Sequence, residues 1–273
     1  MKKKKNYNFL FYILLIISLL GIAYSSYKIF KWSEDNKNTE KETEKIVNET
    51  VVNETETDDN ITLINPDNES KESIYWSYVK MNMIDVNIEE LKQKNSDTKG
   101  WIQLSGTNIN YPFVQANNNS YYLNHSFEKK YTDAGWIFLD YRNNINNLSK
   151  NNIIYGHARL NKTMFGTLKN VLTKDWYNNS DNHVIKLSTE KENTLWQIFS
   201  VYSIKTESYY ITTDFKDNDE FQKFIDTVKG RSKYKFYANV TTDDNILTLS
   251  TCHNTNDKIV VHAKLIMKSK KQS

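Results

Sequence analysis

The sequence predicts a mainly β protein, folded as a closed or nearly closed β-barrel with helices on its outside and preceded by a membrane-spanning segment. Most of the chain after Gly100 consists of short runs rich in β-branched and aromatic residues, separated by Asn, Asp and Gly turns. Helical spacing occurs in only a few places, which is typical of a barrel flanked by helices. An apolar run follows four lysines at the N-terminus.

Composition and charge narrow the possible functions. The chain has 273 residues, a formal net charge of +3 and one cysteine. The basic residues gather at 2–5 and 268–271, whereas 34–72 are acidic, and no basic face with interleaved aromatics indicates nucleic-acid binding. One cysteine excludes an internal disulfide framework and a Cys-rich zinc site. We therefore expect no nucleic-acid partner, no metal and no other cofactor.

Residues 9–30 are predicted to be a transmembrane signal anchor, with 1–8 as its basic cytoplasmic N-terminus. The apolar run matches the roughly 20 helical residues that cross a bilayer, and the lysines before it place the N-terminus inside the cell. A cleaved signal peptide is the alternative, because Ala23-Tyr24-Ser25 fits a small-x-small cleavage site. The run is at or beyond the upper end of the roughly 7–15 apolar residues in such peptides. We therefore favour a single-pass protein of the cell membrane with its folded domain outside.

Residues 31–72 are predicted to be a disordered acidic linker. From 33 onward the segment is polar, acidic and free of aromatic residues. It cannot bury enough apolar surface to offset the entropy of ordering, so we expect a flexible spacer.

Residues 73–273 are predicted to form the folded domain, which contains the catalytic candidates described below. Two short helices are expected at its start, at 74–81 and 87–92, and two more at 164–172 and 221–228. Strands are expected at 101–104, 110–114, 135–139, 152–157, 183–187, 195–202, 236–240, 246–252 and 258–267.

The last two predicted strands contain the main chemical candidate, Cys252. It ends the strand 246–252, and the turn that follows leads into the strand that begins at Lys258. Such a hairpin can set Cys252 beside Lys258, whose charge would favour the nucleophilic thiolate. The alternative is a buried cysteine that packs as a small apolar residue, which is the commoner fate of this residue type. Its place beside a polar turn argues against burial.

A cysteine nucleophile needs a proton shuttle, and the chain has five histidines, of which His157 fits best. It ends a strand and precedes a polar loop, where functional side chains are often delivered. His253 is adjacent to Cys252, but successive strand residues point to opposite faces. His262 lies mid-strand, and neither His125 nor His183 has a companion. These residues alone favour His157 without excluding the others.

Several ordered motifs resemble the class B sortases, cysteine transpeptidases of Gram-positive cell surfaces. Thr248-Leu249-Ser250-Thr251-Cys252 resembles their Thr-Leu-x-Thr-Cys motif, and Tyr155-Gly156-His157 with 162–168 resembles their histidine segment. The runs 100–102, 135–143 and 260–265 extend the resemblance over about 74–267. It implies an eight-stranded sortase-type barrel with N-terminal helices alongside and an extra helix around 221–228.

The resemblance also implies an activity. Cys252 would cleave a sorting signal resembling Asn-Pro-x-Thr-x after Thr through a thioacyl intermediate, and His157 would shuttle the proton. The partners would be surface proteins that carry the signal and an amine of a peptidoglycan precursor or cross-bridge. A catalytically weak barrel that only binds sorting signals or wall peptides is the alternative. A pilus-polymerising, class C-like enzyme is disfavoured by the missing C-terminal membrane segment and lid.

One residue departs from the family pattern. Sortases carry an arginine where this chain has Lys258, which supplies the charge without the two-pronged donor geometry. Lys258 could act less effectively, Arg142 or another arginine could replace it, or the enzyme could be slow or specialised. Candidate substrate contacts, named only as hypotheses beside strand or core packing, are Ser250, Thr251, Tyr209 and Tyr210.

Overall fold

The computed structural model describes residues 7–55, 61–252 and 257–271, and the side chains of Tyr7, Asn8 and Cys252 lie outside this description. Eight strands form a closed ring in the order β10-β7-β6-β5-β4-β8-β9-β11, and the pairing of β10 with β11 closes it. The predicted closed barrel is confirmed. The eight strands are β4 (Thr98–Leu104), β5 (Asn110–Val114), β6 (Phe138–Leu139), β7 (Asn151–His157), β8 (Val184–Thr189), β9 (Glu192–Lys205), β10 (Ile246–Cys252) and β11 (Asp257–Lys270).

The two faces of β10 show how the barrel is layered. Leu247 and Leu249 belong to the main core inside the barrel, whereas Ile246 belongs to a second core under helix α5 (Asn218–Gly230). This alternation follows from the period of two residues in a strand. Because β10 is covered on both faces, it is buried along the length for which burial is described.

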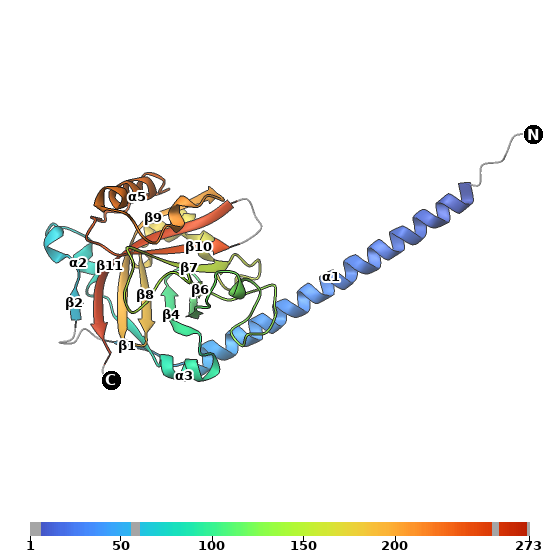
Figure 1. The fold of residues 1–273 in the computed structure, drawn as a ribbon, viewed down its shortest axis with the longest axis horizontal. Coiled ribbons are helices and arrows are strands. Elements are labelled where there is room, and N and C mark those ends of the chain that lie inside the picture. Colours follow the sequence, from blue (N-terminus) through green and yellow to red (C-terminus); the bar gives the residue numbers. More distant parts are fainter. Residues whose placement is uncertain (1–6, 56–60, 253–256, 272–273) are drawn as a thin grey trace, which may run out of the picture.

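Helix α5 confirms the helix expected at 221–228. Asp217 caps it by accepting a hydrogen bond from the backbone N–H of Glu220 at 2.9 Å. Its buried residues are spaced three or four apart, as expected of one helix face. That face consists of Phe221, Phe224, Ile225 and Val228. It packs on the outside of the barrel (Figure 1).

Two of the three remaining predicted helices are shorter than expected. α2 (Tyr75–Tyr78) is one turn, α3 (Ile88–Lys94) is capped by Asn87, and the expected helix at 164–172 is reduced to the 3-10 helix η3 (Leu168–Leu172). Met164 adopts a left-handed φ of 52°, which a helix cannot contain. No strand forms at 236–240, so that prediction is wrong.

In the parts of 31–72 that the structure describes, at 31–55 and 61–72, helix and strand form where a disordered linker was predicted. α1 (Tyr7–Glu49) continues past the apolar run, and β1 (Val52–Thr55) pairs with β3 (Met83–Val86). β2 (Ile61–Leu63) pairs with residues 267–269 of β11, and η1 (Pro66–Asn68) follows. Composition alone missed this order because it arises from contacts with the barrel.

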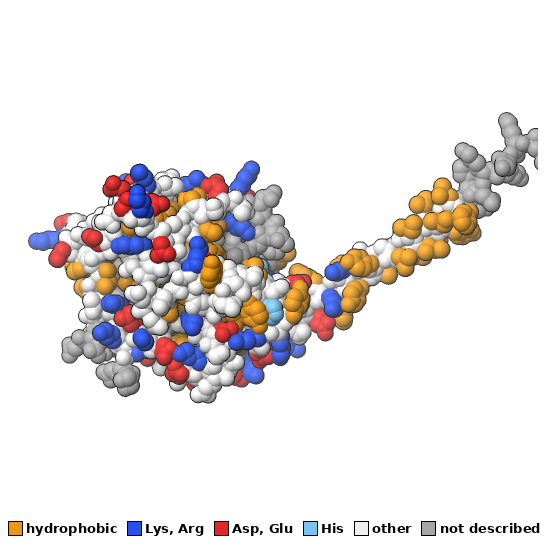
Figure 2. All heavy atoms as spheres, viewed as in Figure 1, with side chains coloured by type: hydrophobic (Ala, Val, Ile, Leu, Met, Phe, Trp, Pro, Cys, Tyr) orange, Lys and Arg blue, Asp and Glu red, His pale blue; other side chains and the backbone are white. Residues whose placement is uncertain are grey.

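α1 contains a stretch that is long and apolar enough to cross a membrane. Its N-terminal half projects from the barrel and exposes its apolar side chains (Figures 1 and 2). This arrangement is compatible with a membrane anchor.

Candidate active site

The barrel brings the ends of β7 and β10 together. These strands are parallel neighbours, and their register pairs Ser250 with Tyr155 and Cys252 with His157. Parallel partners in register lie side by side, about 4.8 Å apart in the hydrogen-bonding direction. Cys252 and His157 are far apart in the sequence, and the pairing of β7 with β10 makes them neighbours.

Backbone contacts hold the His157 ring. Its Nε2 donates to the carbonyl oxygen of Leu123 at 2.6 Å. The carbonyl can only accept, so Nε2 carries a hydrogen and the exchangeable proton of the imidazole belongs to Nδ1. Gly135 allows this approach: its φ is +58°, and an added Cβ would lie 2.9 Å from His157 Cδ2 and 2.5 Å from the carbonyl oxygen of Tyr122.

The other described histidines are held elsewhere. His125 stacks on a tyrosine ring and contacts a backbone carbonyl in the 3-10 helix η2 (Tyr121–Leu123). Burial lowers the pKa of His183, which lies in an aromatic cluster. Burial also lowers the pKa of His262, to about 3, and keeps it neutral. His253 lies outside the described residues.

His262 belongs to a buried chain of hydrogen bonds behind the β7–β10 pair. Tyr209 Oη donates to Tyr202 Oη at 3.0 Å, and Tyr202 Oη donates to His262 Nε2 at 2.8 Å. Thr248 Oγ1 lies 2.8 Å from His262 Nδ1 and donates to Asn151 Oδ1 at 2.6 Å. Thr248 gives its one hydroxyl proton to Asn151, so it can only accept from His262. The hydrogen of the neutral His262 ring is therefore on Nδ1. The chain links β9, β11, β10 and β7.

Lys258 lies at the start of β11, across the hairpin from Cys252. The register pairs Ser250 with Val260, so its continuation by two residues sets Lys258 opposite position 252. The backbone N–H of Ile259 donates to Thr251 Oγ1 at 2.9 Å and supports this continuation. Lys258 is half-buried.

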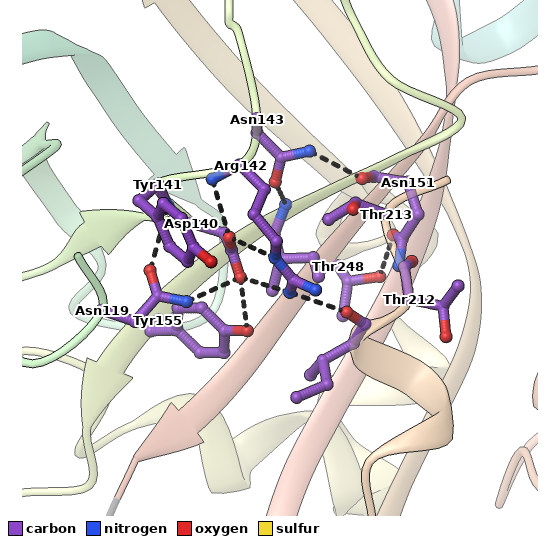
Figure 3. Close-up of polar contacts among 12 residues, drawn as sticks. Asn119, Asp140, Tyr141, Arg142, Asn143, Asn151, Tyr155, Thr212, Thr213 and Thr248 are labelled. Atoms are coloured by element: carbon purple, nitrogen blue, oxygen red, sulfur yellow. Dashed lines mark hydrogen bonds and ion pairs between the residues drawn. The ribbon is translucent and has the colours of Figure 1, made fainter. Parts of the chain in front are cut away.

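Arg142 is held by a buried carboxylate, as Figure 3 shows. Its Nε and Nη2 donate to the two carboxylate oxygens of Asp140 at 2.8 and 2.7 Å, and Nη2 also donates to the carbonyl oxygen of Ile211 at 2.9 Å. Asn119 and Tyr155 donate to the same carboxylate at 2.9 and 3.0 Å. Burial alone raises the pKa of Asp140, but these hydrogen bonds, chiefly from Arg142, outweigh it and hold the pKa below its ordinary value.

The other two arginines also have partners. Arg159 Nη2 donates to Asn36 Oδ1 on α1. Arg231 lies 3.3 Å from Glu207 and covers the ring of Tyr209, 4.5 Å from its centroid. The guanidinium groups of all three arginines are therefore engaged by other partners.

The candidate substrate contacts are mostly buried. Ser250 and Tyr210 share a hydrogen bond of 3.2 Å between their hydroxyls, and Thr251 accepts from the backbone of Ile259. Tyr209 is half-buried beside Arg231. These contacts fit structural roles, and substrate contact by the four residues stays a prediction.

The segment that carries the two tyrosines, η5 (Tyr209–Ile211), is held by three successive carbonyl contacts. Asn151 Nδ2 donates to the carbonyl oxygens of Tyr210 and Thr212 at 3.1 and 2.8 Å. Arg142 donates to the carbonyl oxygen of Ile211, which lies between them in the sequence. Ser250 contacts the same segment through Tyr210. Both β7 and β10 therefore fix η5 beside the strands that end at His157 and Cys252.

Sequence reasoning missed the carbonyl of Leu123, Gly135 and the role of Asp140. A backbone carbonyl has no sequence signal, whereas the glycine and the Asp-x-Arg spacing were visible only as part of a resemblance.

Within 7–55, 61–252 and 257–271, no group of three His, Cys, Asp or Glu could hold a metal ion. A cavity of about 750 Å³ lies between 68–74 and 232–239, and none of these site residues lines it.

A sortase-domain family model matches residues 102–266 of the chain. The chain belongs to the sortase family. The match begins within β4, ends within β11, and includes the positions of His157, Cys252 and Lys258.

Its relatives are class B sortases. The chain is 40% identical to sortase B of Staphylococcus aureus over 182 residues, 65% of this chain and 74% of that protein. It is 36% identical to sortase B of Listeria monocytogenes over 185 residues, 66% of this chain and 74% of that protein. The chain is thus a class B sortase and a cysteine transpeptidase.

Solved structures agree with this assignment. The Staphylococcus aureus sortase B–substrate complex has a TM-score of 0.62 at 40% identity, covering 66% of this chain and 84% of that one. Bacillus anthracis sortase B in complex with AAEK1 has a TM-score of 0.67 at 31% identity, covering 85% of this chain and 98% of that one. The eight-stranded barrel with flanking helices is therefore the class B fold.

Proposed function

We propose that this sortase cleaves a C-terminal sorting signal resembling Asn-Pro-x-Thr-x after Thr and joins the surface protein to a peptidoglycan amine. The observation that carries the proposal is the register that pairs Cys252 with His157 at the ends of β10 and β7. Two solved relatives support it, a Staphylococcus aureus sortase B–substrate complex and a sortase B complexed with triglycine.

The proposed chemistry uses two residues in turn. The Cys252 thiolate attacks the Thr carbonyl carbon, and the peptide C–N bond breaks as imidazolium His157 protonates the leaving amine. An acceptor amine then attacks the thioester, gives a proton to His157 and releases the thiolate. The position of the exchangeable proton on Nδ1 supports this role, because Nε2 is occupied by Leu123.

Lys258 is proposed to stabilise the developing oxyanion. Its place across the hairpin from Cys252 supports this role, as do the partners that engage Arg142, Arg159 and Arg231. An ammonium supplies positive charge through a single point rather than through a planar fork.

The membrane assignment is also a proposal. The apolar part of α1 is taken as an uncleaved anchor at 9–30, with 1–8 in the cytoplasm and the barrel outside. Its length, composition and exposure in the fold support this. Because 61–63 and Glu69 pack on the barrel, the proposed catalytic domain begins before the residue 73 expected from sequence.

The function is tested with the full-length chain in detergent and a quenched peptide that contains Asn-Pro-x-Thr-x. Cleavage between Thr and the next residue is expected, and added triglycine is expected to appear on the Thr carboxyl group. Mass spectrometry of both fragments measures this. Binding of the peptide without cleavage would favour the alternative of a catalytically weak barrel.

Lys258→Ala is expected to lower kcat for peptide cleavage by about 10²–10³, the usual cost of losing one oxyanion donor. Lys258→Arg is expected to retain activity because it keeps the charge and adds a second donor. Steady-state kinetics on the same peptide measures both variants. The matched control is Lys205→Ala, an exposed lysine on neighbouring β9; an unchanged kcat for Lys258→Ala would rule out the role.

A further inference from the structure

The two halves of α1 differ in what they contact. From Phe9 to Phe30 its large apolar side chains are all exposed, as the orange atoms of Figure 2 show. The polar half beyond them packs on the catalytic domain along one stripe. The buried residues of the stripe are Asn36, Thr39, Thr43 and Ile46. Spacings of three and four put them on one helix face.

The stripe contacts a loop that begins at the active-site histidine. Arg159 is two residues after His157, and its side chain is only 10% exposed. It donates to Asn36 Oδ1 and lies 3.6 Å from Asp35 Oδ2. Asp35 also accepts a hydrogen bond of 2.5 Å from Thr132 Oγ1. One helical turn of α1 thus joins two loops of the catalytic domain.

Further contacts continue along α1. Asn161 Nδ2 donates to Glu40 Oε1 at 3.1 Å, and the backbone N–H of Glu128 donates to Glu42 Oε1 at 2.9 Å. The loop 128–133 follows the segment whose Leu123 carbonyl holds His157. The helix is therefore attached to the structural surroundings of His157 rather than to a remote face.

The attachment lies close to the end of the apolar run. Asp35 is five residues beyond Phe30, a rise of about 7.5 Å along a helix. The polar layer of one leaflet is about 5–8 Å thick, from the difference between about 30 Å of hydrocarbon and about 40–45 Å overall. If 9–30 span the membrane, Asp35 and Thr132 lie at the outer edge of the lipid headgroups.

The surface at this level combines exposed aromatic residues with lysines and carboxylates. A groove of about 470 Å³ between α1 and the loop 131–133 is lined by Lys28, Lys31, Trp32 and Tyr131, together with Glu34, Asp35, Asn38, Thr132 and Asp133. Tyr131 is 72% exposed and Trp32 is 50% exposed. Tyrosine and tryptophan favour the headgroup level, and lysine ammonium groups donate to phosphate.

We propose that α1 and the loop 128–133 form one surface that lies on the outer leaflet, with phospholipid headgroups in this groove. The inference rests on the membrane anchoring proposed above. It means that the His157 end of the barrel is held at the membrane surface and receives substrates that are themselves attached to the membrane.

The test measures the depth of single fluorophores in vesicles of phosphatidylglycerol and phosphatidylethanolamine. The full-length chain carries Cys252→Ser, so that one new cysteine can be labelled, either Tyr131→Cys or Tyr237→Cys. Both tyrosines are 72% exposed, which makes Tyr237 a matched control that does not line the groove. Lipid with a nitroxide on its headgroup is expected to quench the label at 131 and not at 237.

The outcomes distinguish the proposed membrane anchor from the proposed headgroup-binding surface. A chain that does not float with vesicles overturns the anchor and this inference together. A chain that floats but shows equal quenching at 131 and 237 overturns this inference alone.

A second pair of variants tests the attachment. Asp35→Ala with Asn36→Ala is expected to lose the quenching at 131, because the loop is no longer fixed to the helix. Lys37→Ala with Lys41→Ala, both exposed on α1, is the control and is expected to keep it. Full quenching in the Asp35/Asn36 variant would overturn the role of these contacts.

Discussion

Cys252→Ala is expected to abolish cleavage and transfer, and His157→Ala to lower kcat by about 10²–10⁴, the usual contribution of a general acid and base. The difference follows from their proposed roles. Without the thiol no thioester can form, so the covalent route is lost altogether. Without the imidazole, water can still protonate the leaving amine slowly.

Two measurements separate these variants. Intact-protein mass spectrometry during turnover is expected to show a thioacyl adduct with the wild type, a slower one with His157→Ala, and none with Cys252→Ala. Thermal unfolding is the control that both variants are folded. Wild-type turnover by Cys252→Ala would rule out the nucleophile, and wild-type turnover by His157→Ala would rule out the proton shuttle.

The strands near the site were predictable from local pattern. The run 246–252 coincides with β10, and 110–114 with β5, because β-branched and aromatic residues between turn residues identify a strand without tertiary information. The neighbourhood of Cys252 and His157 was not predictable from periodicity. It depends on a parallel pairing between strands separated by β8, β9 and α5, which no local pattern specifies.

The errors share a physical cause. The linker was expected to be disordered because it is polar, acidic and free of aromatic residues from 33 onward. Glu and Lys are nevertheless good helix formers, and α1 gains polar contacts such as that of Asn36 with Arg159. The helix expected at 164–172 has apolar helical spacing, yet Met164 takes a left-handed conformation where the chain turns. In both segments tertiary contacts override the local signal.

Glu69, near the end of the segment predicted to be a linker, forms a buried ion pair whose loss should strongly destabilise the fold. Lys264 Nζ on β11 lies 2.5 Å from Glu69 Oε1, and the two side chains are only 1% and 2% exposed. Ser73 Oγ donates to the other oxygen of Glu69 at 2.7 Å, and Lys264 also donates to the carbonyl oxygen of Asn239. The pair is therefore a buried ion pair with additional hydrogen bonds, and it ties residue 69 to the barrel.

Glu69→Ala is expected to lower the free energy of unfolding by about 3–5 kcal/mol, because it leaves a buried ammonium without its counter-ion. Chemical denaturation of a chain that begins at residue 33 measures this. The control is Glu192→Ala, whose partner Lys268 is on the same strand as Lys264. This pair is 3.6 Å long and partly exposed, and its loss should cost about 1 kcal/mol or less.

The same pair tests where the proposed catalytic domain begins. A chain that starts at Ser73 lacks both Glu69 and β2, and should lose at least about 3–5 kcal/mol relative to one that starts at residue 61. In the longer chain, Glu69→Leu with Lys264→Met should avoid most of the loss caused by Glu69→Ala, since apolar replacement of both members of a buried pair is often neutral or stabilising. If the chain from Ser73 is as stable as the longer one, Glu69 is not part of the folded domain and the boundary expected from the sequence is correct.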